Sequence, residues 1–293
     1  MSQIDLNAEK ADTTRAVPTF IGIGPPKCAT TWLDDALRRH PDIYLPPKQK
    51  EVFYFDRFFD RGHDWYANLF ATAGETAAVG EISTSYVLER QTIERIHAFN
   101  PDVKLVCILR DPVARLISHY RMFVENGRTT VGLEDTLQKQ PLLRQCSAYA
   151  SLLENVLSVF PREQLHLGIF EEILQSPDSQ RKYFASLCAF LDVPAAALQD
   201  ETFDQRVRET YGKPKSLWLV KKAKAMRSYL RRNDMEHIVS LADRFGINRK
   251  AFLSKSAKPE IAEETRQSLR QEFAKDVAYV ETFLGRELGL WAR

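Results

Sequence analysis

The chain has 293 residues, of which 44% are hydrophobic and 27% charged, and 41 Lys and Arg nearly balance 39 Asp and Glu for a formal net charge of +2. These proportions are typical of a soluble globular protein and exclude a collagen, a disulfide-rich miniprotein and an intrinsically disordered chain. The small net charge argues against a protein that coats nucleic acid, so we expect no nucleic-acid partner. The length suffices for one large domain that buries a sizeable core without disulfides.

No segment of the sequence has the pattern of a membrane span or of an export signal. The longest apolar runs fall well short of the ~20 residues that a membrane span needs. Residues 1–15 are polar and mixed in charge, without the apolar stretch of a secretory signal. We therefore predict a disordered leader over residues 1–17, one domain over residues 18–293 and a cytoplasmic location. The 4 cysteines are widely spaced, which fits reduced thiols in that compartment.

The first elements in chain order are a strand and a helix joined by a loop. Residues 19–24 form a short apolar run bounded by prolines, which predicts a buried strand. A helical pattern runs from Leu33 and ends near His40, because the residue before Pro41 disfavours the helical conformation. Folds of the α/β class that bind nucleotides begin in this way.

The elements that follow continue this alternation of strands and helices. Further strands are predicted over residues 79–82, 104–109 and 165–170, and further helices over residues 93–99, 114–123 and 183–191. The alternation predicts a single α/β domain with a central, mostly parallel sheet flanked by helices. The last third is helical and charged from about Leu217, with a break at Pro259 and a final helix predicted over residues 262–284.

The loop after the first strand has the features of an anion-binding site. A strand that leads through a loop into a helix N-terminus presents free backbone N–H groups to a ligand, and here the loop adds Lys27, Thr30 and Thr31. It is not a Walker A loop, since Pro26 precedes the lysine and Cys28 follows it in place of the hydroxyl that binds Mg²⁺. The alternative is an ordinary strand-to-helix turn with a threonine N-cap.

A second candidate site residue stands at the carboxyl end of the strand predicted over residues 104–109. Ligands of open α/β sheets bind outside such strand ends, where this chain has Arg110. Asp111 and Pro112 then begin a helix, and Ser118 lies about two turns along it. Arg110 and Ser118 can together hold a second phosphate group. The alternatives are a surface ion pair between Arg110 and Asp111 and a solvated Ser118 hydroxyl.

These two motifs and three shorter ones carry a resemblance to a known family. Residues 20–33 (FIGIGPPKCATTWL) resemble the 5′-phosphosulfate loop of sulfotransferases that use 3′-phosphoadenosine 5′-phosphosulfate (PAPS). Residues 105–120 (LVCILRDPVARLISHY) resemble their 3′-phosphate motif, in the same order and spacing. Residues 50–56 (KEVFYFD), 64–66 (DWY) and 80–86 (GEISTSY) are similar to the branch that includes the heparan sulfate sulfotransferases. The resemblance implies a P-loop-like sulfotransferase fold in a PAPS-dependent member of the family. The lack of a visible secretory signal or membrane anchor fits a bacterial cytosolic member better than a Golgi enzyme.

The resemblance also implies how the donor is bound. Lys27 would stabilise the leaving 5′-phosphate, cradled by the loop, while Arg110 and Ser118 would hold the 3′-phosphate. Trp32 would border the nucleotide, unless it is a core aromatic. Residues 254–260 (SKSAKPE) resemble the family's loop over the 3′-phosphate and adenine, although the usual Gly-Arg pair is absent. The donor-binding residues implied in this way are Lys27, Cys28, Ala29, Thr30, Thr31, Trp32, Arg110, Ser118, Lys255 and Ser256.

The reaction that the resemblance implies is transfer of a sulfuryl group from PAPS, without a metal. A hydroxyl, or less readily an amine, of a glycan, glycolipid or small metabolite would attack the sulfur in line and release PAP, the 3′,5′-bisphosphate. Glu51 matches the base of the heparan sulfate branch, and its alternative is a solvated charge. That branch has a lysine after its second glutamate, whereas this chain has Ile82 after Glu81. His63 and His119 are candidate bases outside any matching motif.

Two other functions compete with sulfuryl transfer. A nucleotide-dependent kinase would need Mg²⁺ and a Walker B carboxylate, and the departures from Walker A count against it. A non-catalytic nucleotide binder would keep the fold without turnover. A screen of PAP against ATP, with and without Mg²⁺, separates the three.

A basic segment over residues 213–232 contains eight Lys and Arg and no acidic residue. Apolar residues recur in it at helical spacing, as in an amphipathic helix that contacts a membrane surface or an anionic ligand. It would then border the acceptor site or steer PAPS, and the alternative is a solvated helix. Aromatic residues are dense over residues 53–70, where they either frame an acceptor or belong to the core.

Overall fold

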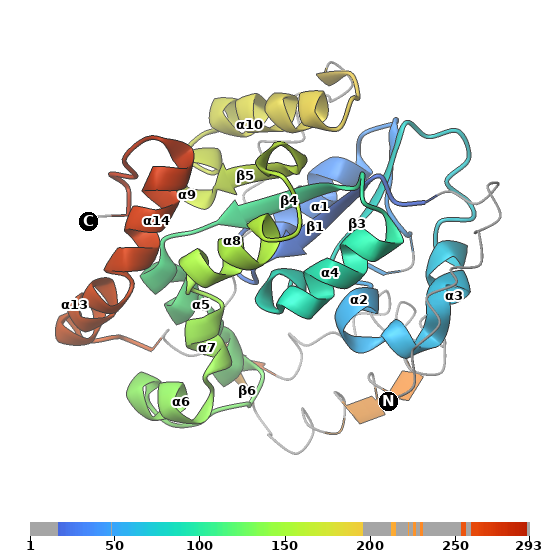
Figure 1. The fold of residues 1–293 in the computed structure, drawn as a ribbon. Coiled ribbons are helices and arrows are strands. Elements are labelled where there is room, and N and C mark those ends of the chain that lie inside the picture. The colour runs from blue at the N-terminus through green and yellow to red at the C-terminus, as the bar shows by residue number, and fades with distance from the viewer. Residues whose placement is uncertain are drawn as a thin grey trace, which may run out of the picture.

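The computed structural model describes residues 17–47, 49–195, 212–214, 253–255 and 259–291, and the isolated positions 222, 225, 226, 229 and 230. Strands and helices alternate through most of this part of the chain (Figure 1). The elements up to the fourth strand are β1 (Phe20–Gly24), α1 (Thr30–Arg38), β2 (Ile43–Tyr44), α2 (Tyr54–Arg57), η1 (Phe59–Arg61), α3 (Gly62–Asn68), β3 (Ala78–Ile82), η2 (Tyr86–Leu88), α4 (Arg90–Phe99) and β4 (Lys104–Leu109). Those that follow are α5 (Pro112–Glu125), α6 (Leu133–Lys139), α7 (Leu142–Gln145), α8 (Tyr149–Leu157), η3 (Arg162–Gln164), β5 (Leu165–Ile169), α9 (Phe170–Ile173), α10 (Pro177–Phe190), β6 (Gly212–Pro214), β7 (Leu253–Lys255), α13 (Glu263–Glu272) and α14 (Ala274–Leu284).

The central sheet has five strands in the order β2-β3-β1-β4-β5, and every neighbouring pair is parallel. In the middle of the sheet, Phe20 of β1 aligns with Gly80 of β3 and with Lys104 of β4. Parallel strands need helical crossovers, and these place helices on both faces of the sheet. The predicted α/β fold with a flanked parallel sheet is confirmed.

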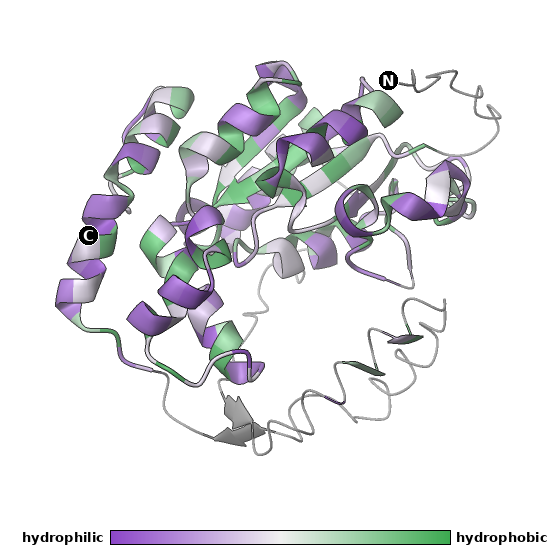
Figure 2. Cartoon of the chain, turned by 60° about the horizontal axis from the view of Figure 1, so that its bottom comes forward, coloured by the Kyte–Doolittle hydropathy of each residue, from purple (hydrophilic) through white to green (hydrophobic). Residues whose placement is uncertain are grey.

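The two faces of the sheet bury two separate hydrophobic clusters, because successive side chains of a strand point in opposite directions. On β4, Leu105 and Cys107 belong to the cluster that α4 and α8 cover, whereas Val106 and Ile108 belong to the cluster that α1 and α10 cover. Figure 2 shows the hydrophobic strands inside and the hydrophilic sides of the helices outside. The continuous apolar run of β4 is thus explained by burial on both sides.

The end of the chain differs from the prediction of one helix over residues 262–284. Two helices, α13 and α14, replace it, and the backbone turns between them at Phe273 (Figure 1). Phe273 and Leu269 are buried against α5 and α6, while Val280 is buried in the cluster over the sheet. One straight helix could not bury both apolar groups, so packing overrides the continuous helical pattern.

Helix α10 begins at Pro177, six residues before the predicted start at residue 183. Ser176 is its N-cap, and the Ser176 hydroxyl accepts a hydrogen bond from the backbone N–H of Ser179 at 3.1 Å. A serine followed by a proline is a helix-start signal that the periodicity argument overlooked.

Candidate active site

The site lies where β1, β3, β4 and β5 end, since parallel strands bring their carboxyl ends to one edge of the sheet. Ligands of open α/β sheets bind outside this edge. The segments that leave these four strands carry most of the candidate site residues, among them Lys27, Thr84, Arg110 and Glu171.

The backbone of the loop after β1 is shaped to receive an anion. Lys27 and Ala29 have φ angles of 75° and 55°, in the left-handed region that L residues rarely adopt. Such alternation turns successive backbone N–H groups toward one point and forms an anion-binding concavity. Ala29 is the N-cap of α1 and no side chain caps this first turn in the described structure. The alternative of a threonine N-cap is therefore wrong.

Gly24 fixes the path of the chain into this loop. It has a φ of +100°, and a Cβ atom at this position would lie 2.3 Å from the carbonyl oxygen of Thr84. Only glycine permits this approach, which brings the start of the loop against the segment that follows β3.

The side chains of the loop differ in what they offer a ligand. Lys27 and Thr30 are half-buried and Thr31 is exposed, so all three are within reach of solvent. The Cys28 thiol is fully buried, and burial raises its pKa to about 12. Cys28 can therefore contribute a backbone N–H group but not its side chain.

Arg110 joins the two phosphate motifs. Its Nη1 atom donates to the carbonyl oxygen of Lys27 at 3.4 Å, across 83 residues of sequence. The guanidinium group lies on the ring of Phe170, 4.2 Å from its centroid, with Nε 3.9 Å from Glu171 Oε1. Among the described residues Arg110 forms its ion pair with Glu171 and not with Asp111, whose carboxylate accepts from Ala114 N at 2.6 Å and caps α5. Arg110 is thus held at the sheet edge, beside the loop.

The helix that carries Ser118 is anchored by a buried arginine. Ser118 is half-buried in α5, one turn beyond Arg115, which is fully buried. Arg115 donates to Ser147 Oγ at 2.6 Å and contacts His119 Nδ1 at 3.1 Å. Burial, and then the Arg115 charge, lower the pKa of His119 to about 3. A buried imidazole with this environment is a poor candidate base.

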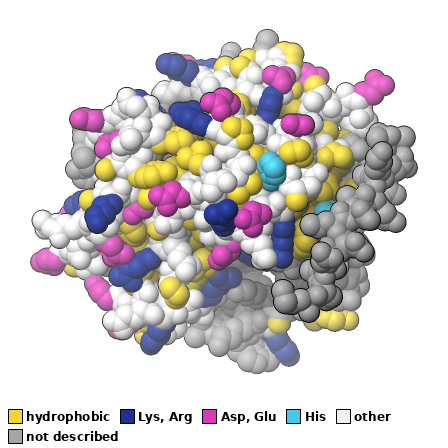
Figure 3. All heavy atoms as spheres, viewed as in Figure 1, with side chains coloured by type: hydrophobic (Ala, Val, Ile, Leu, Met, Phe, Trp, Pro, Cys, Tyr) yellow, Lys and Arg dark blue, Asp and Glu magenta, His cyan; other side chains and the backbone are white. Residues whose placement is uncertain are grey.

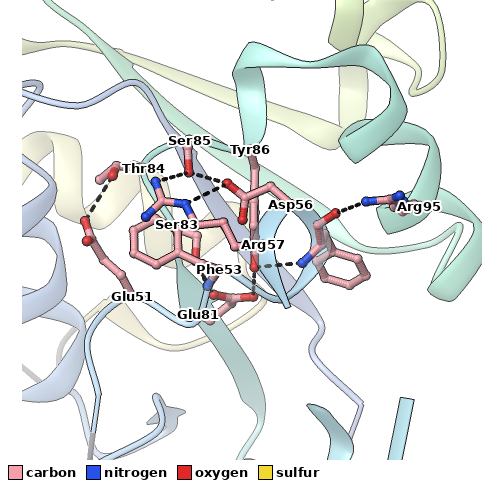
Figure 4. A network of polar contacts seen from close by, with 11 residues as sticks. Glu51, Phe53, Asp56, Arg57, Glu81, Ser83, Thr84, Ser85, Tyr86 and Arg95 are labelled. Atoms are coloured by element: carbon pink, nitrogen blue, oxygen red, sulfur yellow. Dashed lines mark hydrogen bonds and ion pairs between the residues drawn. The ribbon is translucent and has the colours of Figure 1, made fainter. Parts of the chain in front are cut away.

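Glu51 reaches the same edge from the segment before α2. It is half-buried, and Thr84 Oγ1 donates to Glu51 Oε1 at 3.0 Å (Figure 4). The neighbouring Lys50 donates from Nζ to Thr31 Oγ1 at 2.9 Å, and burial lowers the pKa of Lys50. The Lys50–Glu51 pair therefore bridges the first turn of α1 and the end of β3.

This arrangement has known counterparts. A family model described as the sulfotransferase domain matches residues 18–241. The chain belongs to the sulfotransferase family. Human heparan sulfate glucosamine 3-O-sulfotransferase 3B1 is 31% identical over 176 residues, which is 56% of this chain and 44% of that protein. The Dictyostelium discoideum membrane-associated sulfotransferase kil1 is 35% identical over 112 residues, 37% of this chain and 24% of that protein.

A solved structure extends the likeness over nearly the whole chain. The sulfotransferase from Alicyclobacillus acidocaldarius superposes with a TM-score of 0.67 at 27% identity, over 95% of this chain and 100% of that one. By contrast, the chain spans less than half the length of the curated heparan sulfate relatives it matches first.

Trp32 occupies a core position in this sulfotransferase. It is 8% exposed, its Nε1 atom donates to Gln180 Oε1 at 2.7 Å, and its ring centroid lies 6.0 Å from that of Tyr183. These contacts attach α1 to α10. A contact of Trp32 with the nucleotide stays a prediction.

Ile82 stands where the resemblance to the heparan sulfate branch predicts a lysine. It is 1% exposed and packs against Gly22 of β1, on the face of β3 opposite Glu81. A cation at this position would be buried in the core. The ammonium group of Lys50 instead supplies positive charge next to Glu51.

The residues near the C-terminus that are predicted to bind the donor are only partly described. The backbone of Lys255 ends β7, which pairs with β6 in antiparallel register, and β6 lies next to α5. Arg121 of α5 also donates to the carbonyl oxygen of Pro259 at 3.3 Å. The Lys255 side chain, Ser256 and nearly all of the basic segment over residues 213–232 lie outside the described residues, so their roles stay predictions.

The aromatic residues between positions 53 and 70 are mainly core. Tyr54, Phe55, Tyr66 and Phe70 are fully buried in the cluster under α4. Of the two alternatives for this stretch, burial favours the core.

Sequence reasoning missed four residues that shape this site, namely Lys50, Thr84, Phe170 and Glu171. Glu171 accepts from the backbone N–H of Asp111 at 3.1 Å and from Trp291 Nε1 at 2.8 Å, so it fixes the start of α5. Phe170 and Glu171 directly follow β5, and their place at a strand's carboxyl end is the signal that could have found them.

The described residues contain neither a metal-ligand cluster nor a helix that could span a membrane. Across those ranges, no group of three or more His, Cys, Asp and Glu is arranged to hold a metal ion. Every helix within them is too short or too polar to span a bilayer.

Proposed function

We propose that this chain transfers the sulfuryl group of PAPS to a hydroxyl group and releases PAP. The observation that carries the proposal is the contact between Arg110 and the Lys27 carbonyl, which brings the two predicted phosphate motifs together at one edge of the sheet. The Glu51 carboxylate lies at the same edge, bonded to Thr84. Membership of the sulfotransferase family supports it over the kinase alternative.

Different residues of the chain would bind the two phosphate groups of the donor. The N–H groups of residues 27–30 and the Lys27 ammonium would bind the 5′-phosphate, while Arg110 and Ser118 would hold the 3′-phosphate. Phe170 and Glu171 fix the direction of the Arg110 guanidinium group. Two neighbouring anion sites suit a nucleotide with phosphates on both the 3′ and 5′ positions.

Catalysis then requires a base and a stabilised leaving group. Glu51, oriented by the Thr84 hydroxyl, would take the proton of the acceptor hydroxyl as its oxygen bonds to sulfur. Lys27 would stabilise the negative charge that collects on the 5′-phosphate oxygen as its bond to sulfur breaks. The proton ends on Glu51 and the electron pair of the broken bond ends on PAP, so the step balances without a metal.

A glycan, a glycolipid or a small hydroxylated metabolite is the proposed acceptor, with a cytoplasmic location for the reaction. The likeness to heparan sulfate glucosamine 3-O-sulfotransferases supports a sugar hydroxyl. Variable loops build acceptor pockets, so the fold leaves the acceptor to experiment.

Two measurements test the proposal. Thermal shift should show stabilisation by PAP, without a requirement for Mg²⁺, and little by ATP. PAPS turnover against a panel of hydroxylated acceptors should give a product heavier by one SO₃ group. Stabilisation by ATP only with Mg²⁺ would favour the kinase, and PAP binding without transfer to any acceptor would favour a non-catalytic binder.

A further inference from the structure

A buried carboxyl group, Glu81, lies behind the site on β3. Its side chain is fully buried, and Oε1 accepts hydrogen bonds from Tyr66 Oη and Tyr86 Oη, each at 2.9 Å. Oε2 accepts from Ser83 Oγ at 2.6 Å, and the backbone N–H of Val52 also bonds to this carboxyl. In the described part of the chain, these partners are neutral groups, and all of them donate.

The same partners hold the backbone that follows Glu51. Ser83 Oγ accepts from the N–H of Phe53 at 2.9 Å, and Tyr86 Oη accepts from the N–H of Phe55 at 3.4 Å. Glu81 and its partners thus hold three of the four backbone N–H groups of residues 52–55, that of Val52 directly and those of Phe53 and Phe55 through Ser83 and Tyr86. Figure 4 shows Ser83 and Tyr86 between Glu81 and this stretch. This stretch includes Phe53, whose φ of 55° is strained for a non-glycine residue.

Glu81 also fixes the other partner of the base. Ser83, which donates to Glu81, directly precedes Thr84, and Thr84 donates to the Glu51 carboxylate at 3.0 Å. The network therefore reaches Glu51 from both sides, through its own backbone and through its hydroxyl partner.

We infer that Glu81 is a positioning residue for the base, whose ionised carboxylate holds Glu51 and Thr84 in register with the phosphate loop. This inference rests on the proposed function. Glu81 has no direct part in the reaction and acts only through Glu51.

The charge on Glu81 matters because each hydroxyl has one proton to give. An ionised carboxylate accepts from all three hydroxyl groups, whereas a protonated one becomes a donor and displaces one of them. Burial raises the pKa of Glu81 to about 7. The titratable groups that face it are Tyr66 from α3 and Tyr86 from η2, and burial followed by the Glu81 charge raises both phenol pKa values, so both remain neutral donors.

The raised pKa of Glu81 makes the stability of the fold depend on pH. Because the pKa of folded Glu81 is above the ordinary value of 4.5, the contribution of Glu81 to the free energy of unfolding is greatest at low pH and is lost as the pH rises through about 7. Ionisation of this buried carboxyl as the pH rises through about 7 therefore costs the fold stability, which fits a functional use of the charge. We expect kcat to fall as the pH decreases through about 7, as Glu81 is protonated and Glu51 loses its alignment.

The test is Glu81→Gln, which keeps the volume but replaces one acceptor oxygen with a donor. We expect kcat to fall roughly 10- to 100-fold, with the dissociation constant of PAP unchanged and the limb near pH 7 removed. In the double variant with Glu51→Gln, kcat should be no lower than in Glu51→Gln alone, since both act through one group. If the kcat losses of the two single variants multiply in the double variant, or if Glu81→Gln leaves kcat unchanged, the inference is overturned but the proposed function still stands.

Two milder variants keep the inference testable if Glu81→Gln does not fold. Ser83→Ala removes the link to Phe53, and Tyr86→Phe removes one hydroxyl at constant shape. Tyr44→Phe is the matched control, because the Tyr44 hydroxyl bonds to Thr72 at 2.7 Å away from this network. Loss of kcat in both test variants but not in the control is the expected result.

A readout that needs no turnover separates the inference from the function it rests on. Carbon-13 NMR of glutamate-labelled protein reports the Glu51 carboxyl, assigned by its disappearance in Glu51→Gln. Its titration should change in Glu81→Gln and Tyr86→Phe and not in Tyr44→Phe. An unchanged Glu51 titration in all three refutes the inference, whatever the protein transfers.

Discussion

At the residue scale, the assignment of Glu51 as base rests on its place at the sheet edge and on the Thr84 hydroxyl. Glu51→Gln keeps the shape but cannot accept a proton, so kcat should fall by about 10²- to 10⁴-fold. PAP affinity, measured by calorimetry, should be nearly unchanged because the base does not touch the donor. Glu94→Gln, which alters an exposed ion pair on α4, should match the parent protein. Near-normal turnover of Glu51→Gln would reject this base.

Arg110 makes a separate prediction at the same scale. Arg110→Ala should weaken PAP binding about tenfold to a hundredfold, the usual range for a lost charged hydrogen bond. The PAP affinity of Arg110→Lys should lie between those of Arg110→Ala and the parent protein. Lysine keeps the charge, but it cannot form bidentate hydrogen bonds or stack on an aromatic ring as the guanidinium group does. Calorimetry measures the PAP affinity of both variants, with Arg39→Ala as control, because Arg39 is the exposed C-cap residue of α1 and pairs with Asp35. Equal PAP affinity in all four proteins would remove Arg110 from the donor site.

At the scale of elements, the loop depends on how β1 ends. Gly24→Ala combines an unfavourable φ with a clash against Thr84, and it should disturb both the loop and Glu51's hydroxyl partner. Gly74→Ala is the matched control, since its φ of +61° is also positive but nothing lies within 4 Å of the added Cβ. The control should lose only about 1–2 kcal/mol in denaturant unfolding, the cost of the left-handed conformation. Gly24→Ala should lose more, together with PAP affinity, and equal losses would show that the close approach is unimportant.

The elements themselves were predictable where a local signal was strong. The apolar runs of β1, β3, β4 and β5 gave their strands, and Asp111-Pro112 gave the start of α5, whose cap is observed. The sequence did not predict β2, which has two residues, or the helices α2 and α7, which have four residues each, because such short elements show no clear hydrophobic periodicity. The division of the last helix at Phe273 depended on two separate hydrophobic clusters, which no window of sequence contains.

At the scale of the whole molecule, charge is spread unevenly along the chain. On the face in Figure 3, basic and acidic side chains are interspersed over the described residues, as the net charge of +2 suggests. The uncompensated cations are concentrated in residues 213–232. Neutralising Lys221, Lys222 and Lys224 should raise the KM for PAPS and flatten its dependence on salt, because steering of an anion is screened by ions. An unchanged KM at low and high salt would mean that the segment is only a solvated surface.

The sequence by itself determined the α/β class and the parallel sheet, because these follow from local apolar runs, and its short contiguous motifs predicted which residues bind the donor's phosphates. Tertiary structure alone decided that Arg110 reaches the Lys27 carbonyl and that Phe170 and Glu171 hold it there, since these residues come from three different strand ends. It also decided that Trp32 is a core residue and that Ile82 faces away from the site. In addition, it decided that the neighbouring hydroxyls of Ser83 and Thr84 bond to Glu81 and to Glu51. The physical reason is that a strand's two faces and a sheet's carboxyl edge exist only once distant strands have paired. The small net charge of the chain says nothing of a single buried carboxylate, because the stability cost and the use of such a group depend on the hydroxyl groups folded around it.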